Sequence, residues 1–311
     1  MVKVLVTGAD GFAGSFLVEN LLANDYNVRA LVRNTPILNI PSRRVRKSMG
    51  KLKRLEIVKG DVMDYPSIQK ALMHVDQVYH LASMSGIEET RRNPQGAWSD
   101  TTGTFNVINA CIENRIQRMM YCSTCHVYGP QSTFPITESN IPQPNDIYSA
   151  SKYSCETLSR ALMNMNPDLD IVFSRAFNHY GPRQRENWLV PKIIMQALRD
   201  GSVHLGGNTS RDFSYVTDIV DGYRLIMEKG KRGEIYQLCS GIERTVEEIA
   251  EDVISVIGRR DIAVSFAVPR SADIPRSYGD AGKAIRELGW ERRVPWTEGL
   301  RRTVKWYQER P

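Results

Sequence analysis

Three evenly spaced glycines near the N-terminus constrain the fold of this chain more than any other feature of its sequence. A short apolar run rich in β-branched residues, residues 2–6, suits a buried parallel strand. Gly8, Gly11 and Gly14 follow at once, and residues 15–23 then carry apolar side chains at helical spacing. A strand, a glycine turn and a helix in this order form the context that a phosphate-binding loop requires.

Each glycine of the turn has its own physical role in this interpretation. Gly8 permits a tight turn, Gly11 lets a pyrophosphate approach the backbone, and Gly14 lets the helix pack closely on the strand. The helix N-terminus adds N–H donors and the positive end of the helix dipole. The spacing is G-x-x-G-x-x-G rather than G-x-G-x-x-G. We expect a bound dinucleotide that contacts Gly8, Gly11, Phe12, Ala13 and Gly14.

The second expected strand, residues 27–32, ends at Arg33 with no acidic residue. An acid at this point holds the ribose hydroxyls of NAD, whereas an arginine accommodates the 2′-phosphate of NADP. The sequence therefore favours NADP slightly over NAD, and stacking of Arg33 on the adenine is the alternative. Asp61 is expected to accept from the adenine amino group or, alternatively, to cap a helix around residues 66–73. Further cofactor contacts are expected at Val62, Leu81, Ala82 and Ser83.

Strands and helices alternate through the first half of the chain, which predicts a parallel sheet covered by helices. We expect an α/β fold, with a Rossmann-type doubly wound parallel sheet and a smaller C-terminal α/β substrate lobe. Further strands are expected at residues 55–58, 77–82, 117–122, 169–175 and 236–239. Helices are expected from the segment 211–218 to about Lys229, and at 246–257, 283–288 and 300–308. The NAD(P)-binding domain is expected at 1–175 plus about 212–250, and the substrate lobe at 176–211 and about 251–311.

Charge and hydrophobicity narrow the classes of partner. Residues 29–59 hold ten Lys or Arg and one acidic residue, so this segment accounts for the net charge of +6. It has no interleaved aromatic residues for stacking on bases. We therefore expect a solvated loop, or attraction of the cofactor phosphates, and no nucleic-acid partner. The chain has no run of eighteen apolar residues and begins on its first strand, which predicts a cytoplasmic protein with no membrane contact.

The five cysteines are odd in number and scattered, a pattern typical of reduced thiols. Cys122 and Cys125 stand at C-x-x-C spacing with His126 directly behind them, as in some metal, redox and haem sites. No second Cys or His pair stands at zinc spacing. We expect no metal site.

Tyr148 and Lys152 are the strongest candidates for catalysis. Residues four apart on a helix share a face, and an ammonium beside a phenol favours the phenolate and lowers the pKa of the tyrosine. Such a tyrosine can take a proton from a hydroxyl, or return one, while a hydride moves. Ser123 and Thr124 lie at the end of an expected strand, where a hydroxyl can hold the reacting oxygen. The alternative is a packed tyrosine, a solvated lysine and an ordinary turn.

The whole chain resembles the extended short-chain dehydrogenase/reductases that modify nucleotide sugars. The matching motifs are Gly8-x-x-Gly11-x-x-Gly14, Gly60-Asp61, His80-Leu-Ala82, Ser123-Thr124, Tyr148-x-x-x-Lys152, Phe177-Asn-His-Tyr-Gly-Pro182, Arg211-Asp-Phe213 and Glu287-Leu-Gly-Trp290. The resemblance implies that Tyr148 is the acid/base, that Lys152 tunes it and anchors the ribose, and that Thr124 with Ser123 binds the sugar oxygen. It also implies a homodimer formed by helices at about 98–114 and 149–165. Substrate contacts are expected at Thr124, Cys125, Asn178, Arg183, Arg211 and Arg270.

Two departures from the resembling enzymes bear on the reaction. Sugar-nucleotide 4,6-dehydratases have Ser-Thr-Asp-Glu or Ser-Thr-Ser-Glu at this strand end, and their carboxylates move the protons of water elimination. This chain has Cys125 and His126 there. His126 could itself move a proton beside a ketone, or it could be inert. Asp100 stands where an asparagine is usual.

These residues predict an NAD(P)-dependent enzyme that acts on a nucleotide-activated hexose. We expect this enzyme to oxidise the C4 hydroxyl of the sugar. We favour an epimerase, because it needs no acid or base beyond Tyr148. The alternatives are a reductase of 4-keto-6-deoxy sugars, which the stretch Phe177-Asn-His also resembles, and then a 4,6-dehydratase. A non-catalytic dinucleotide-binding sensor is the rival from another class.

Overall fold

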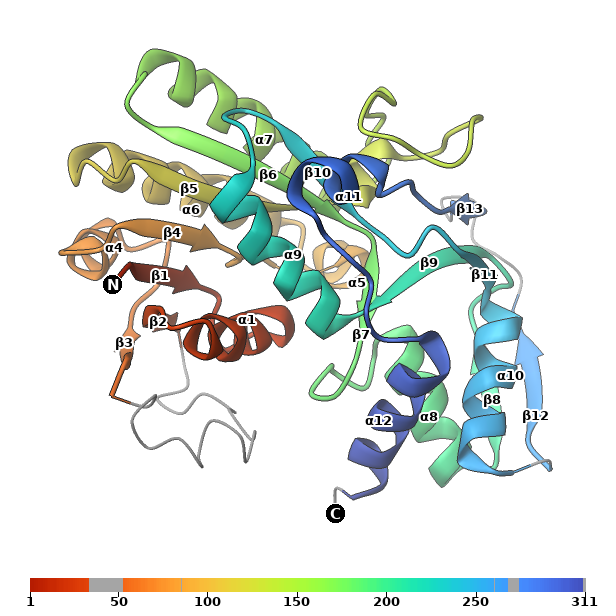
Figure 1. Ribbon diagram of the computed structural model, residues 1–311. Helices are drawn as coiled ribbons and strands as arrows, with labels where there is room; N and C mark the ends of the chain where they lie inside the picture. The colour runs from red at the N-terminus through yellow and green to blue at the C-terminus, as the bar shows by residue number, and fades with distance from the viewer. Residues whose placement is uncertain (34–52, 85, 260, 268–273, 310–311) are drawn as a thin grey trace.

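A seven-stranded, wholly parallel sheet forms the centre of the computed structural model, which describes residues 1–33, 53–84, 86–259, 261–267 and 274–309. The strand order is β10-β6-β5-β4-β1-β2-β3 (Figure 1). The strands are β1 (Lys3–Thr7), β2 (Asn27–Val32), β3 (Leu55–Lys59), β4 (Gln77–His80), β5 (Arg118–Thr124), β6 (Asp170–Ala176) and β10 (Ile235–Leu238). The order reverses direction between β1 and β4, and ligands of open α/β sheets bind outside the carboxyl ends at such a point.

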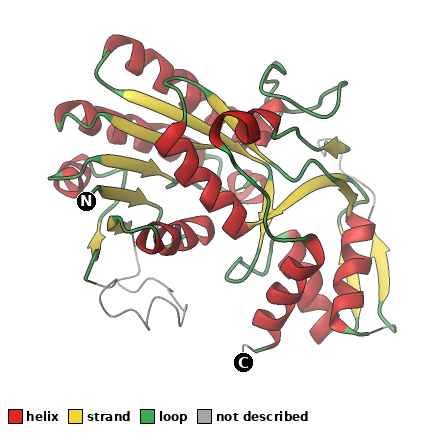
Figure 2. Cartoon of the chain, in the orientation of Figure 1, coloured by secondary structure: helices red, strands yellow, loops and turns green. Residues whose placement is uncertain are grey.

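Helices cover both faces of this sheet (Figure 2). Their bounds are α1 (Phe12–Ala23), α4 (Tyr65–Leu72), α6 (Gln95–Glu113), α7 (Ile147–Met165) and α9 (Val216–Lys229). Alternate residues of β1 enter two separate cores: Val4 and Val6 pack with α1 and α9, whereas Leu5 packs with α4, α6 and α7. A strand buried on both faces must be apolar throughout, which explains the run of valines and leucine.

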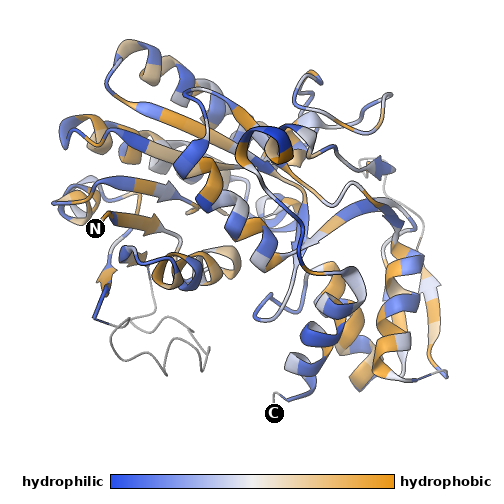
Figure 3. Cartoon of the chain, viewed as in Figure 1, coloured by the Kyte–Doolittle hydropathy of each residue, from blue (hydrophilic) through white to orange (hydrophobic). Residues whose placement is uncertain are grey.

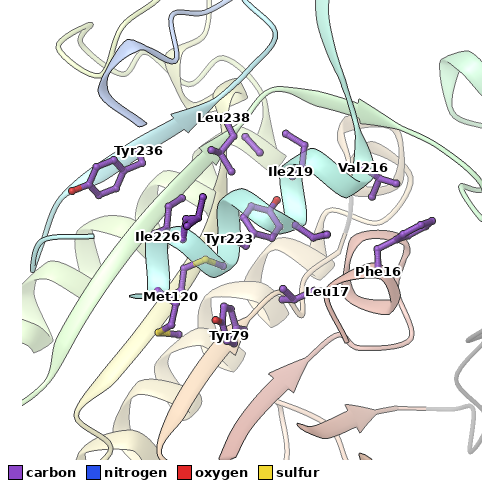
Figure 4. Packing of buried hydrophobic residues seen from close by; sticks show 14 of the residues in the cluster. Phe16, Leu17, Tyr79, Met120, Val216, Ile219, Tyr223, Ile226, Tyr236 and Leu238 are labelled. Carbon is purple, nitrogen blue, oxygen red and sulfur yellow. The ribbon is translucent and has the colours of Figure 1, made fainter. Parts of the chain in front are cut away.

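The core on the α1 and α9 side is shown in Figure 4. Ile219, Tyr223 and Ile226 of α9 belong there to one buried cluster with Met120 of β5, Leu238 of β10 and residues of α1. Because α1 packs against both the sheet and α9, it is apolar around most of its surface and appears mostly orange in Figure 3. The expected buried positions of this helix are confirmed.

A second lobe, with its own core, is built from short strands and three helices. Its strands are β7 (Asn178–Tyr180), β8 (Ser202–Leu205), β9 (Ser210–Tyr215), β11 (Glu243–Thr245), β12 (Ala263–Phe266) and β13 (Arg276–Ser277). Its helices are α8 (Leu189–Arg199), α10 (Val246–Ile257) and α12 (Trp296–Gln308). The chain returns to the sheet with α9, β10 and α11 (Gly282–Leu288), so both lobes are assembled from separate segments.

The structure corrects two sequence predictions in this part of the chain. Residues 211–215 are strand rather than helix, because Asp212 and Ser214 alternate into the interior while β9 pairs with β7, β11 and β13. The helix begins only at Val216. In addition, α10 packs on α8 and α12, and α11 packs on α9 and β10, so the expected division of the C-terminal half at about residue 250 does not follow the packing. None of the helices in the described part of the chain is long and apolar enough to cross a membrane.

Candidate active site

The glycine turn after β1 has the close contacts that its sequence predicts. Gly8 has a φ of +66°, and a Cβ added there would lie 2.8 Å from the backbone nitrogen of Ala82. A Cβ on Gly14 would lie 2.1 Å from the carbonyl oxygen of Gly8. Gly11 is the N-cap of α1 and supplies no side-chain cap, so the N–H groups of the first turn face a phosphate position. The turn therefore fits a dinucleotide.

A buried histidine ties this turn to β4 and α6, a role that sequence reasoning missed. The Thr7 hydroxyl accepts from the backbone N–H groups of Leu81 and Ala82, at 3.2 and 3.1 Å. It must then donate its own proton to His80 Nδ1, 2.8 Å away, and His80 Nε2 donates to the Thr104 hydroxyl at 3.1 Å. Burial lowers the pKa of His80 to about 3, so the ring is neutral and fixes the 81–82 backbone beside the glycines.

The other expected cofactor contacts lie along the carboxyl edge of the sheet. Arg33 is exposed directly after β2. The Asp61 carboxylate accepts from the N–H of Met63 at 3.0 Å, so it holds a turn and does not cap the next helix. Val62 packs against Gly103 of α6, where a Cβ would lie 2.6 Å from its side chain. Leu81, Ala82 and Ser83 follow β4 directly.

Tyr148 stands at the start of α7, beside the carboxyl end of β5. A capping box between Asp146 and Ser149 fixes the first turn of this helix. Thr124 ends β5, its hydroxyl accepts from the N–H of His126 at 3.2 Å, and its interaction with the Tyr148 phenol favours a lower pKa of that phenol. The His126 ring lies edge to face against the Tyr148 ring, with centroids 6.0 Å apart. The structure thus brings together three of the residues predicted from sequence.

The predicted effect of Lys152 on the tyrosine is not what the structure shows. Burial raises the pKa of Tyr148 above its ordinary value, and the hydrogen bond from Thr124 opposes this shift only in part. Lys152 is buried, and its ammonium donates to the carbonyl oxygen of Cys122 at 2.9 Å while lying 5.1 Å above the Tyr121 ring. The ammonium thus hydrogen-bonds a backbone carbonyl of β5 rather than the phenol.

Ser123 is also placed differently from the prediction. Its hydroxyl donates to the Glu156 carboxylate, which forms a buried ion pair with Arg175. The Arg175 guanidinium donates to both carboxylate oxygens, at 3.0 and 2.6 Å, and stacks on the Tyr128 ring. Ser123 therefore belongs to a structural network beneath the site, whereas the Thr124 hydroxyl interacts with the Tyr148 phenol.

A cavity of about 320 Å³ is lined by residues of both lobes, among them His126, whose ring contacts Tyr148, although Tyr148 itself does not line it. Residues 145–147, His126 and Arg211 line it, together with the short helix α5 (Ile87–Arg92), whose contribution the sequence analysis missed. The sequence feature that could have indicated a contribution of α5 is its polar stretch in the segment that follows the carboxyl end of β4. Burial and the Arg211 charge lower the pKa of His126 to about 4, and Asp146 opposes the shift, so His126 is neutral near pH 7.

Three further predicted substrate contacts have other partners in the structure. Cys125 is buried, and burial raises the pKa of its thiol to about 12, so it is a packing residue. Arg183 donates to Ser15 and Glu19 of α1, at 3.2 and 2.7 Å, and so ties the lobes together instead of facing the cavity. Asn178 donates weakly to the Asp212 carbonyl, at 3.4 Å. Arg211 lines the cavity, and Arg270 lies outside the described residues.

The residues that the structure describes offer no candidate site for a metal ion. They contain no cluster of three or more His, Cys, Asp or Glu side chains suited to a metal ion. Cys122 and Cys125 are free thiols, as are the other three cysteines. The Cys122 thiol donates to the Tyr223 hydroxyl at 3.2 Å.

Comparison with known proteins gives a consistent set of relatives. The sequence model of the GDP-mannose 4,6-dehydratase family matches residues 5–303. A dTDP-glucose 4,6-dehydratase of Actinoplanes is 30% identical and covers 99% of this chain and 98% of its own length. The human dTDP-D-glucose 4,6-dehydratase is 28% identical and covers 99% of this chain and 90% of its own length.

Solved structures of two activities share the fold. A dTDP-glucose 4,6-dehydratase from Streptomyces venezuelae, solved with NAD bound, has a TM-score of 0.89 at 30% identity and covers 99% of this chain and 97% of its own. A UDP-glucose 4-epimerase from Thermotoga maritima, solved with UDP-glucose, has a TM-score of 0.88 at 28% identity and covers 99% of both chains. The proteins that resemble this chain in sequence and structure therefore include both dehydratases and epimerases.

Proposed function

Because this chain belongs to the GDP-mannose 4,6-dehydratase family of extended short-chain dehydrogenase/reductases, enzymes that act on nucleotide sugars with a nicotinamide dinucleotide, we propose that it oxidises C4 of a nucleotide-activated hexose. The observation that carries this proposal is the group of Tyr148, Thr124 and His126 beside a cavity at the carboxyl edge of the sheet. The glycine turn lies at the same edge.

Each residue of the site has a separate role in the proposed reaction. Tyr148 takes the proton of the C4 hydroxyl, and Thr124 holds the oxygen and stabilises the phenolate. Oxidised nicotinamide, when bound, would supply the hydride acceptor. Arg211 lines the cavity and offers planar donors to a diphosphate or a sugar hydroxyl. The first turn of α1 offers its N–H groups to the cofactor phosphates.

We propose that the reaction is an epimerisation at C4. An epimerase returns the hydride to the other face of the ketone, and Tyr148 gives back its proton, so no further acid or base is needed. Cys125 is a buried thiol and His126 is neutral, so this pair offers no carboxylate for the elimination of water.

A 4,6-dehydratase is the second candidate, favoured by the names of the relatives and by the position of His126 in the cavity wall. Elimination requires loss of a proton at C5 and protonation of the departing C6 hydroxyl, and a neutral imidazole can perform the first step. A reductase is a third possibility, and it would need a reduced cofactor supplied with each turnover.

Incubation with a panel of UDP-, dTDP- and GDP-hexoses tests the proposal. We expect a product of unchanged mass whose C4 configuration is inverted, as read by NMR. A product lighter by one water would instead establish the dehydratase, and consumption of NADPH with a 4-keto sugar would establish the reductase. Binding of the sugars without turnover of any would reject all three and leave the sensor.

Replacing His126 with alanine separates the first two candidates further. In an epimerase that uses Tyr148 alone, we expect turnover to fall less than about tenfold, because the edge-to-face ring contact is lost but no proton transfer is. A dehydratase would lose about 10²- to 10⁴-fold in water elimination while C4 oxidation continued. Hydride transfer and product mass, followed in single-turnover experiments, distinguish the outcomes. His74, a histidine outside the site, provides the matched control as His74→Ala.

Replacing Arg33 with aspartate tests the choice of cofactor. The sequence favours NADP, and solved neighbours contain NAD. If the exposed Arg33 binds the 2′-phosphate, the variant should lower the ratio of NADP to NAD affinity by about tenfold or more, because a like charge would face the phosphate. Titration of each cofactor by fluorescence measures the ratio, and an unchanged ratio would show that Arg33 does not contact that phosphate.

We also propose the homodimer that the resemblance implies. Its two helices are observed as α6 and α7, which pack side by side. On α6, Trp98 is 75% exposed and Phe105, two turns later, is 39% exposed. Such large exposed apolar side chains on one helix face suit a partner surface.

A cytoplasmic location stays a prediction.

A further inference from the structure

Asp100 of α6 is a buried carboxylate next to the active site that the proposed reaction leaves without a role. Only 7% of the Asp100 surface is exposed to solvent. Oδ1 accepts from the backbone N–H of Met84 at 2.6 Å, which fixes the loop after β4. Oδ2 is enclosed and has no hydrogen-bond partner among the described residues. An enclosed carboxylate oxygen without a donor is costly unless a positive charge lies nearby.

Lys152 supplies that positive charge from the facing helix. The Cys155 thiol of α7 lies 3.8 Å from the backbone carbonyl of Asp100, and Lys152 precedes Cys155 by three residues, one turn earlier on the same face. The Lys152 ammonium is buried and hydrogen-bonds the Cys122 carbonyl. Asp100 and Lys152 do not form a direct ion pair, and their charges interact at longer range.

The titratable groups around Asp100 come from two elements. The Cys155 thiol of α7 lies 3.8 Å from the Asp100 carbonyl oxygen, and charge interactions link Asp100 with Lys152 and Tyr148 of α7 and with Tyr121 of β5. The loop after β4 contributes only a backbone N–H. Burial raises the pKa of Asp100, and the Lys152 charge opposes that shift. The Asp100 charge in turn contributes to the raised pKa of both Tyr148 and Tyr121.

We propose that Asp100 is the counter-ion of Lys152 and a positioning residue for the acid/base Tyr148. Its carboxylate balances the ammonium that would otherwise be buried with only a carbonyl partner. Its negative charge also opposes formation of the phenolate, so it sets the pH range in which Tyr148 exchanges its proton. The part of this inference that concerns catalysis rests on the proposed function.

Asp100→Asn tests the catalytic part. Asparagine keeps the size of the side chain and the acceptor for Met84 but removes the charge. We expect the acid limb of the pH profile of kcat/KM to move to lower pH by about one unit, since loss of a nearby negative charge favours the phenolate. Asp170→Asn is the control: Asp170 is a partly buried carboxylate paired with Arg118 at the opposite end of the sheet, and its loss should leave the limb in place. A lower rate with an unmoved limb in Asp100→Asn would overturn the proposal.

A second measurement needs neither substrate nor cofactor, so it is independent of the proposed function. In protein labelled with ¹³C at the aspartate carboxyl groups, NMR follows the titration of Asp100 directly. We expect Lys152→Met to raise the pKa of Asp100 by about one unit, because the charge that lowers it is gone. Lys283→Met removes a lysine that pairs with Glu234 instead and should leave Asp100 unchanged. Equal Asp100 titrations in Lys152→Met and the wild type would overturn the assignment, even if Asp100→Asn failed to fold.

Discussion

Tyr148→Phe should lower turnover of the nucleotide sugar by about 10²- to 10⁴-fold while leaving the affinity for the cofactor nearly unchanged. Phenylalanine keeps the ring that contacts His126 and loses only the hydroxyl that hydrogen-bonds Thr124. The glycine turn, where we propose the phosphate contacts, is a separate element. Steady-state kinetics and a cofactor titration on the same preparation measure both quantities.

Tyr153→Phe is the matched control for this experiment. Tyr153 lies five residues later in the same helix, where it packs against the core on the α1 and α9 side. Removing its hydroxyl should leave turnover within about twofold of the wild type, since no proton transfer is affected. Retention of more than a tenth of the activity by Tyr148→Phe would exclude this phenol as the acid/base.

The second large effect concerns stability. Arg175→Met should lower the free energy of unfolding by about 3–5 kcal/mol, because it leaves the Glu156 carboxylate buried without its ion-pair partner. Both side chains are at most 3% exposed, and they share two hydrogen bonds. Urea unfolding followed by circular dichroism gives the difference from the shift of the midpoint.

Two controls separate the buried charge from other causes. The double variant Arg175→Met with Glu156→Leu removes both charges and should recover most of the loss, since a well-packed apolar pair replaces the ions. Arg302→Met breaks an exposed pair with Glu298 and should cost less than about 1 kcal/mol. A single variant Arg175→Met as stable as the wild type would mean that water reaches the Glu156 carboxylate.

Local patterns in the sequence were sufficient to predict individual elements of both lobes. The expected strand 27–32 is observed with those bounds, and the helix expected at 246–257 begins after Thr245 with a capping box to Glu248. Both depend on periodicity and on side chains within three or four residues of one another. Residues 211–215 were predicted wrongly because strand β9 is held by pairing with strands far away in the chain, which no local window contains.

The candidate site was predicted only in part for the same reason. The sequence identified Tyr148, Thr124 and His126 as neighbours at the carboxyl edge, since β5 and α7 must meet there. It did not reveal that Ser123, one residue before Thr124, turns to the opposite side. Successive side chains of a strand point to opposite faces, and only the position of Glu156 showed that Ser123 turns toward that carboxylate.

What the sequence alone determined, then, is the glycine turn, the parallel sheet and the candidate tyrosine, because each depends on residues close together in the chain. The tertiary structure decided the partners of the charged side chains. Arg183 pairs with Glu19, more than 160 residues away in the chain. Lys152 interacts with the charge of Asp100 from another helix, and Arg175 forms an ion pair with a carboxylate inside the core. Burial determines how strongly a charge acts and which charges it meets, and burial exists only once the distant segments have packed together.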